Sequence, residues 1–250
     1  MGSIRPTISV VIVALNEEAR IRDCLESVKW ADEIIVFDSL SQDRTVEICR
    51  EYTSKVWQME YQGGGPMRNL AIEKATGQWI FTIDADERVP PELRDEILRT
   101  LANPSAAAYY LPRKSYFLGR WIKHGGWWPD YVLRLFRKDA GRYNANLAHA
   151  QVITRERAGR LSNTLLHYPF ESLHEYVAKI NSRTSLMARE KNGTASVLKS
   201  FVWATAKFFR TYVFRLGFLD GGEGLVLAIL ASHYAFLKYA KTWEANRRKP

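Results

Sequence analysis

Apolar runs alternate with amphipathic stretches over the first hundred positions, and their spacing predicts the elements. Ile8–Leu15 is a nearly continuous β-branched run, typical of a strand that is covered on both faces. A helix is predicted to begin near Ile21, with Asn16 as its cap, because the apolar residues that follow recur at helical spacing. Further strands are predicted at 33–37, 55–58 and 79–83, and further helices at 44–52 and 63–74.

This alternation predicts an α/β fold with a mostly parallel, Rossmann-like sheet and helices on both of its faces. After residue 104 the pattern changes. Strands are expected at 106–111 and 131–136, a loop rich in glycine and tryptophan at 119–130, and a helix at 171–190. Lys191–Thr194 is the predicted linker. The chain is therefore expected to consist of a core domain over residues 1–190 and a helical tail over 191–250, and the core domain is expected to fold without the tail.

The composition excludes two broad classes of protein. Hydrophobic residues make up 46% of the chain, which is enough to bury a core and excludes wholesale disorder. Only Cys24 and Cys49 are cysteines, which excludes a disulfide-built scaffold and a cysteine zinc cluster. They are interpreted as small buried residues in a reducing compartment.

The positive charge is concentrated at the C-terminal end. Residues 191–250 carry ten Lys and Arg against three Asp and Glu, so they account for seven of the nine net positive charges. Aromatic and aliphatic residues are interleaved with them, which favours an anionic membrane surface over nucleic acid. The most apolar window, Leu225–Leu237, is about half of the ~20 residues that span a bilayer, so attachment in the membrane plane is expected. The alternative is that these helices pack on the core domain or form a dimer interface.

Acidic residues follow two of the predicted strands. Asp84 and Asp86 end the strand at 79–83, and residues i and i+2 of an extended chain point the same way. Both carboxylates could therefore hold one Mg²⁺ or Mn²⁺ ion that bridges phosphate oxygens, or they could cap the next helix. Asp38 ends the strand at 33–37 in a polar turn, in which Ser41 or Asp43 could cap a helix. We expect the Asp38 and Asp84 strands to be neighbours, so that their turns flank one crevice at the carboxyl edge of the sheet.

The glycine-rich segment before Arg68 is a weak candidate for a phosphate-binding loop. It lacks the lysine of a P-loop, and the glycine spacing of a dinucleotide-binding turn is also missing after the first strand. Arg68 itself could reach a pyrophosphate or could form an ion pair on the surface.

The order of these segments resembles the family 2 glycosyltransferases of the GT-A fold. The resemblance rests on Ser9–Glu18, Asp38–Thr45, Arg68-Asn69 and Trp79–Glu87. In the second half, Tyr110–Arg120 and Gly126–Arg137 resemble the lipopolysaccharide core β-1,4-glucosyltransferase subgroup. Two positions depart from that pattern: Leu40 stands where the family usually has glycine, and Ala150 follows His149 where the subgroup commonly has glutamate.

The resemblance implies a role for each matching residue. The donor-binding residues would be Asn16, Glu17, Asp38, Arg68 and Asp84, with Asp38 on the nucleotide base. Asp86, together with Asp84, would bind the metal. Asp130 would be the catalytic base. Asp130 also lies in a loop, where catalytic groups are often held. Attack by a sugar hydroxyl needs a general base within hydrogen-bond reach of it. Trp127 and Trp128 offer flat faces for an acceptor sugar, although tryptophans are more often packing residues. Glu87 is the next candidate for the base.

The expected activity is that of an inverting, metal-dependent glycosyltransferase. It would move a sugar, with glucose expected, from a UDP-sugar to a membrane glycolipid of the lipopolysaccharide core. It would be a cytoplasmic protein, peripheral on the inner face of the cell membrane, and nucleic acid is not an expected partner. Three alternatives remain: a transferase acting on polyprenyl-phosphate-linked or capsular glycan, a nucleotidyltransferase, and a non-catalytic membrane-binding module.

Overall fold

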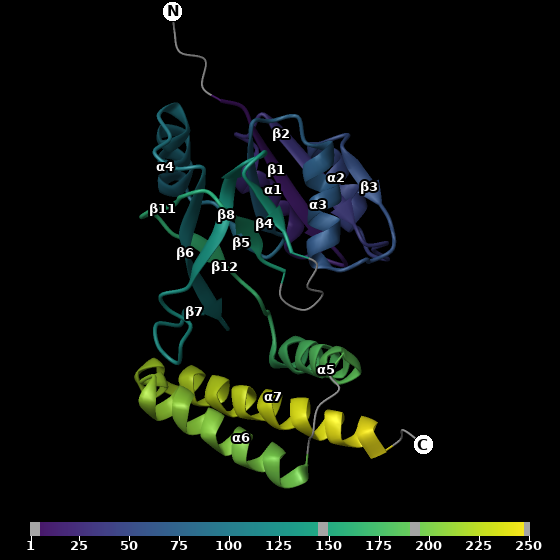
Figure 1. Ribbon diagram of the computed structural model, residues 1–250, viewed down its shortest axis with the longest axis vertical. Helices are drawn as coiled ribbons and strands as arrows, with labels where there is room; N and C mark the ends of the chain where they lie inside the picture. Colours follow the sequence, from purple (N-terminus) through teal and green to yellow (C-terminus); the bar gives the residue numbers. More distant parts are fainter. Residues whose placement is uncertain (1–5, 145–149, 191–195, 248–250) are drawn as a thin grey trace, which may run out of the picture. The chain divides into compact units, whose positions relative to one another are not determined.

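The computed structural model describes residues 6–144, 150–190 and 196–247. These residues form two compact units (Figure 1): unit 1 consists of Met1–Arg113 and Tyr131–His167, and unit 2 of Lys114–Asp130 and Tyr168–Pro250. This division differs from the boundary predicted at residue 190, because the loop at 119–130 groups with the C-terminal helices. The predicted linker at 191–194 and His149 lie outside the described residues.

A parallel sheet forms the centre of unit 1, as the alternation of strands and helices predicts. Its parallel strands have the order β3-β2-β1-β4. β8 pairs with β4 in antiparallel orientation, and β6 pairs with the other edge of β8, also antiparallel. These strands are β1 (Ile8–Ala14), β2 (Glu33–Asp38), β3 (Val56–Gln58), β4 (Trp79–Asp84), β6 (Ala108–Phe117) and β8 (Tyr131–Arg137). The short strands are β5 (Glu87–Arg88), β9 (Gly141–Tyr143), β10 (Val152–Thr154), β11 (Ala158–Arg160) and β12 (Leu165–His167).

The strand order corrects one expectation. β1 lies between β2 and β4, so the strands that end in Asp38 and Asp84 are not neighbours. In the register of the sheet, Ala14 of β1 lies beside Asp38, and Val13 lies beside Asp84. The end of β1 therefore separates the two acidic turns, which places the Asn16 loop between them.

Helices cover both faces of this sheet, which explains the nearly unbroken apolar run of β1. Ile8, Val10 and Ile12 pack on one face with α1 (Ile21–Val28), α2 (Thr45–Tyr52) and α4 (Pro91–Ala102). Val11 packs on the opposite face with α3 (Gly64–Lys74). Since alternate side chains of a strand point to opposite faces, a strand with two covered faces is apolar at nearly every position. The exception in β1 is Ser9, whose buried hydroxyl donates to Glu33.

Unit 2 combines a hairpin with helices. The end of β6 pairs with β7 (Arg120–Trp121), and Phe117 and Ile122 pack against Leu227 in a small core of buried residues. The helices are α5 (Leu173–Glu190), α6 (Val197–Phe209), the π-helix η1 (Arg210–Phe214), the 3₁₀-helix η2 (Gly217–Asp220) and α7 (Gly221–Arg247). Within the described residues, no helix is both long enough and apolar enough to cross a bilayer. Leu227 of α7 completes this core, so removal of the tail would uncover Phe117 and Ile122, and the folding of the core domain without the tail stays a prediction.

Candidate functional site

The loops that follow β1 and β2 are joined by hydrogen bonds. The backbone N–H of Asn16 donates to Ser41 Oγ at 2.8 Å, and Asn16 Oδ1 accepts from the N–H of Gln42 at 2.8 Å. The N–H of Glu17 donates to Thr45 Oγ1 at 2.8 Å. Asn16 therefore does not cap α1, which begins at Ile21 without a side-chain cap. Asn16 and Glu17, which are predicted donor residues, connect the loop after β1 to the loop after β2 at the carboxyl edge of the sheet.

Asp38 shapes the turn in which it lies. The residue is fully buried, and its carboxylate accepts hydrogen bonds from the N–H of Ser41, at 2.9 Å, and from the Ser41 hydroxyl. Leu40, between them, has φ +64°, a left-handed conformation that favours glycine. This explains why glycine is usual there. At the end of the turn, Asp43 Oδ1 accepts from the N–H of Thr45 at 3.0 Å. The N-cap position of α2 is Arg44 and no side chain caps the helix, so neither Ser41 nor Asp43 is its cap.

Asp84 lies between two arginines from different elements. Arg68 of α3 and Arg134 of β8 donate to different oxygens of its carboxylate. Burial raises the pKa of Asp84, but the positive charges of Arg134 and Arg68 outweigh it and hold the pKa well below the usual range. The carboxylate is therefore ionised and neutralised within the protein. Each oxygen of the Asp84 carboxylate accepts from one guanidinium group, and the role of Asp84 in metal binding stays a prediction.

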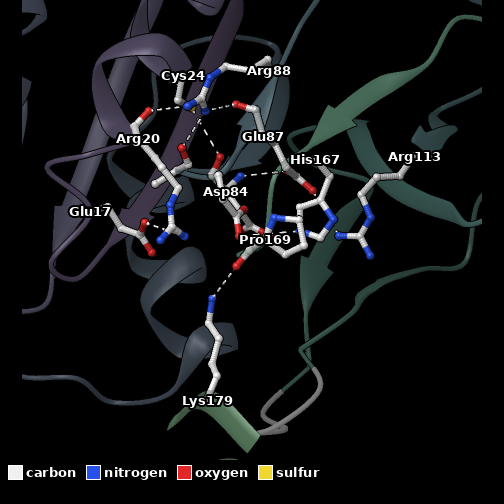
Figure 2. A network of polar contacts seen from close by, with 12 residues as sticks. Glu17, Arg20, Cys24, Asp84, Glu87, Arg88, Arg113, His167, Pro169 and Lys179 are labelled. Carbon is white, nitrogen blue, oxygen red and sulfur yellow. Dashed lines mark hydrogen bonds and ion pairs between the residues drawn. The ribbon is translucent and has the colours of Figure 1, made fainter. Parts of the chain in front are cut away.

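Glu87 belongs to the same polar cluster as Asp84, and Figure 2 shows it between Asp84 and Arg113. The residue is fully buried, and its Oε1 accepts from Arg134 at 2.9 Å and from Arg113 at 3.2 Å. Its Oε2 accepts from the N–H of Asp84 at 2.9 Å, which fixes the strand end. Glu87 was the second candidate for the catalytic base. A carboxylate without solvent exposure that neutralises two arginines is a structural group, so this candidate is wrong.

Asp86 and His167 form a second pair in unit 1. His167 Nε2 lies 3.6 Å from Asp86 Oδ2, and both side chains are largely buried. A carboxylate and an imidazole are ligands that Mn²⁺ accepts, and Mg²⁺ sites usually combine one or two carboxylates with substrate phosphates. No group of three or more acidic, histidine or cysteine side chains arranged for a metal occurs among the described residues. The pair therefore fits a metal whose remaining ligands are phosphate oxygens and water.

The predicted acceptor residues belong to unit 2. Trp127 packs against Phe117 in the unit's apolar core, with ring centroids 6.5 Å apart. Trp128 contacts Trp121 edge-on at 5.6 Å and also lines a surface hollow. Trp127 is therefore a packing residue of this core, which is the alternative to sugar binding given for both tryptophans. Asp130 is half-buried at the end of the same loop.

The loop that carries Asp130 is held by the C-terminal helices. Asp220, which is 2% exposed, accepts from the N–H of Lys123 at 3.2 Å and from the N–H of His124 at 2.7 Å. His124 Nδ1 also lies 3.1 Å from the Asp220 carboxylate, and Arg120 pairs with Glu223 at 3.1 Å. Sequence reasoning missed Asp220, His167 and Arg113. They lie far along the chain from their partners, and no local pattern marks those pairings.

Comparison with known proteins identifies glycosyltransferases as relatives of this chain. The family model described as glycosyl transferase family 2 matches residues 9–159. The lipopolysaccharide core biosynthesis glycosyltransferase LpsC of Rhizobium meliloti is 28% identical to this chain, over 97% of this chain and 94% of its own length. An uncharacterized glycosyltransferase of Rickettsia felis is 30% identical, over 95% and 90% respectively.

Among solved structures, that of S. aureus TarS residues 1–349 in complex with UDP-GlcNAc has a TM-score of 0.52 at 17% identity, covering 97% of this chain and 92% of that one. This likeness concerns the fold and agrees with the predicted GT-A class. The matched family model spans more than half of the chain and includes the Asp38, Arg68 and Asp84–Asp86 segments. The chain therefore belongs to glycosyl transferase family 2.

Proposed function

We propose that this glycosyltransferase moves a sugar, with glucose expected, from a UDP-sugar to a lipopolysaccharide core glycolipid with inversion at the anomeric carbon. The observation that carries the proposal is the arrangement at the end of β4. There Asp84 is neutralised by two arginines, while Asp86 pairs with His167. The acceptor class rests on the similarity to LpsC, whose name assigns it to lipopolysaccharide core biosynthesis.

The proposed reaction is a single displacement. Asp130 takes the proton of an acceptor hydroxyl, whose oxygen forms a bond to the anomeric carbon while the bond from that carbon to the diphosphate breaks. The nucleoside diphosphate leaves with the electron pair of that bond. Asp86 and His167 would hold a divalent cation, which when bound neutralises the charge that develops on the diphosphate. Asn16 and Glu17 keep the loops of the donor site in place.

The test of the proposed function is the release of nucleoside diphosphate by the full-length chain. We expect incubation with candidate UDP-sugars, Mn²⁺ and a lipopolysaccharide core acceptor to release UDP, and EDTA to abolish that release. Asp86→Ala should lower turnover by about 100-fold or more, since even the partners of metal ligands contribute about 10–100-fold to metal affinity. Asp95→Ala, which removes an exposed carboxylate of α4, is the matched control and should leave turnover unchanged.

Other products or acceptors would point to the alternatives. Release of pyrophosphate would indicate a nucleotidyltransferase, and turnover only with polyprenyl-phosphate-linked or capsular glycans would change the acceptor. Full activity in EDTA would contradict the roles of Asp86 and His167. A chain without UDP affinity would favour a membrane-binding module.

We further propose that unit 2 attaches to the anionic cytoplasmic face of the inner membrane. Its helices expose large apolar side chains, among them Leu198 at 72%, Phe201 at 64% and Phe214 at 79%. Lys207, between Phe201 and Phe214 in the chain, and other basic residues of this segment supply positive charge. Exposed aromatic residues together with basic residues are typical of helices that lie in the interface of an anionic bilayer.

Substitution of one exposed aromatic residue tests this attachment. Phe214→Ser should lower binding to vesicles that contain phosphatidylglycerol by about tenfold or more, because burying a Phe side chain stabilises by about 1.5–3 kcal/mol. Flotation of the full-length chain measures this, and binding should also weaken at high salt. Tyr61→Ser removes an exposed aromatic residue of unit 1 and serves as the control. Equal flotation of wild type and both variants would contradict the assignment.

A further inference from the structure

A hollow in unit 2 includes Trp128, a predicted acceptor residue, but none of the residues assigned to the donor, the metal or the catalytic base. Its volume is about 420 Å³, which lies within the usual range of ligand pockets, about 300–1,000 Å³. The lining comes from the loop at 119–130 and from the segment around the end of η1. The lining residues are Lys123, His124, Gly126, Trp128, Pro129, Phe214, Arg215 and Leu216.

Lys123 and Arg215 supply the positive charge of this hollow. In the part of the chain that the structure describes, neither Lys123 nor Arg215 forms an ion pair. Lys123 lies over the ring of Trp121, 4.6 Å from its centroid. The pKa of Lys207 is lowered by burial and by the nearby positive charges of Arg215 and Arg210. The region therefore has a surplus of positive charge.

Asp220, the acidic group beside the hollow, is already occupied. It is almost completely buried, and the N–H groups of Lys123 and His124 donate to it. Its contact with His124 uses Nδ1, so Nε2 is the ring nitrogen that remains for a ligand. The carboxylate therefore orients the imidazole and contributes little to repelling an anion.

The backbone of the loop is shaped around Arg215. Gly126 has φ +88°, and a Cβ at that position would overlap Nη1 of Arg215. The N–H of Gly125 donates to the carbonyl of Arg215 at 2.8 Å. A side chain at position 126 would displace the guanidinium group, so the glycine allows the close approach that places this group at the hollow.

We propose that this hollow binds a phosphate group through Lys123, His124 and Arg215. The planar guanidinium matches two phosphate oxygens and the ammonium adds a point charge. Because Nδ1 of His124 faces the Asp220 carboxylate, its Nε2 can accept a hydrogen bond from a protonated phosphate oxygen. Such a phosphate could be a substituent of a glycolipid acceptor or the headgroup of a membrane phospholipid. Neither source requires the transfer reaction to proceed as proposed, so failure of one proposal does not imply failure of the other.

Binding of small phosphate probes to the full-length chain tests the site. The side-chain N–H signal of Trp128 in protein labelled with ¹⁵N-tryptophan, assigned with Trp128→Phe, should shift in a saturable manner on titration. The probes are inorganic phosphate, short-chain phosphatidic acid and short-chain phosphatidylglycerol, with short-chain phosphatidylcholine as the neutral reference. Lys123→Gln and Arg215→Gln should each raise the dissociation constant by about tenfold or more, as expected for a charged hydrogen bond.

Matched controls separate the site from general charge. Arg247→Gln removes one positive charge from the same unit, at the far end of α7, and should leave the dissociation constant unchanged. Lys123 is exposed, so its variant tests the proposal even if Arg215→Gln disturbs the loop. Saturable binding of inorganic phosphate and phosphatidic acid would support a phosphomonoester substituent, and binding of phosphatidylglycerol would support a headgroup. Equal weakening by Arg247→Gln, or no saturable shift with any phosphate probe, would overturn the proposal.

Discussion

Asp130→Asn is expected to abolish sugar transfer while the chain still binds UDP. The substitution keeps the size of the side chain and removes only the carboxylate that would accept the proton of the acceptor hydroxyl. General-base catalysis contributes about 10²–10⁴-fold, so turnover should fall by that factor. Donor affinity should be retained, because the predicted donor residues belong to unit 1, whereas Asp130 belongs to unit 2. Initial rates and a calorimetric titration with UDP and Mn²⁺ measure the two quantities.

A second aspartate provides the control for this substitution. Asp139 is exposed and pairs with Arg137 on the surface, so Asp139→Asn should leave both turnover and UDP affinity unchanged. Near-normal turnover of Asp130→Asn would show that Asp130 is a structural residue. The base would then have to be sought elsewhere than at Glu87, since Glu87 is buried between two arginines.

Glu87→Ala is expected to cause the largest loss of stability of any single substitution considered for this chain. The side chain is fully buried, neutralises Arg134 and Arg113, and accepts the N–H of Asp84. Removing one partner of a buried ion pair leaves an uncompensated charge and lowers the free energy of unfolding by about 3–5 kcal/mol. Urea unfolding of the full-length chain, followed by circular dichroism, measures this change.

Two further variants define the cause of that loss. Glu87→Gln keeps an oxygen that can accept the N–H of Asp84, so it should destabilise less than Glu87→Ala. Glu47→Ala breaks an exposed ion pair with Arg44 and should leave the unfolding midpoint essentially unchanged. If Glu87→Ala unfolds at the same urea concentration as the wild type, the buried network does not stabilise unit 1.

The order of strands and helices in unit 1 was predictable because its signals are local. The nearly unbroken apolar run of β1 follows from burial on both faces of the strand, and the helical spacing after Ile21 follows from burial of one face of α1. The lateral position of β1 between β2 and β4 was not predicted, because pairing between parallel strands leaves no mark in either strand's own sequence. For the same reason, Asn16 was expected to cap a nearby helix, whereas its side chain bonds to Gln42.

The sequence predicted several residues of the candidate site, but it did not predict which residues they contact. The positions of Asp84 and Asp86 at a strand end follow from their spacing, but the arginines that neutralise Asp84 come from α3 and β8. His167 is 81 positions from Asp86 in the sequence numbering and carries no signal of that pairing. The roles assigned to Asp38, Asp130 and the tryptophans stay predictions until the variants are measured.

The chain passes between its two units three times, after residues 113, 130 and 167, and this limits how the protein can be recombined with its relatives. A chimera with a single breakpoint near residue 190 would receive new C-terminal helices but keep its own 120–126 loop. The contacts of that loop with Asp220, Glu223 and Arg215 would then join residues from two different proteins. A chimera that aims to exchange acceptor preference therefore has to move residues 114–130 together with 168–250. Those two segments form one compact unit and have to be exchanged together, although 37 residues of unit 1 separate them in the sequence.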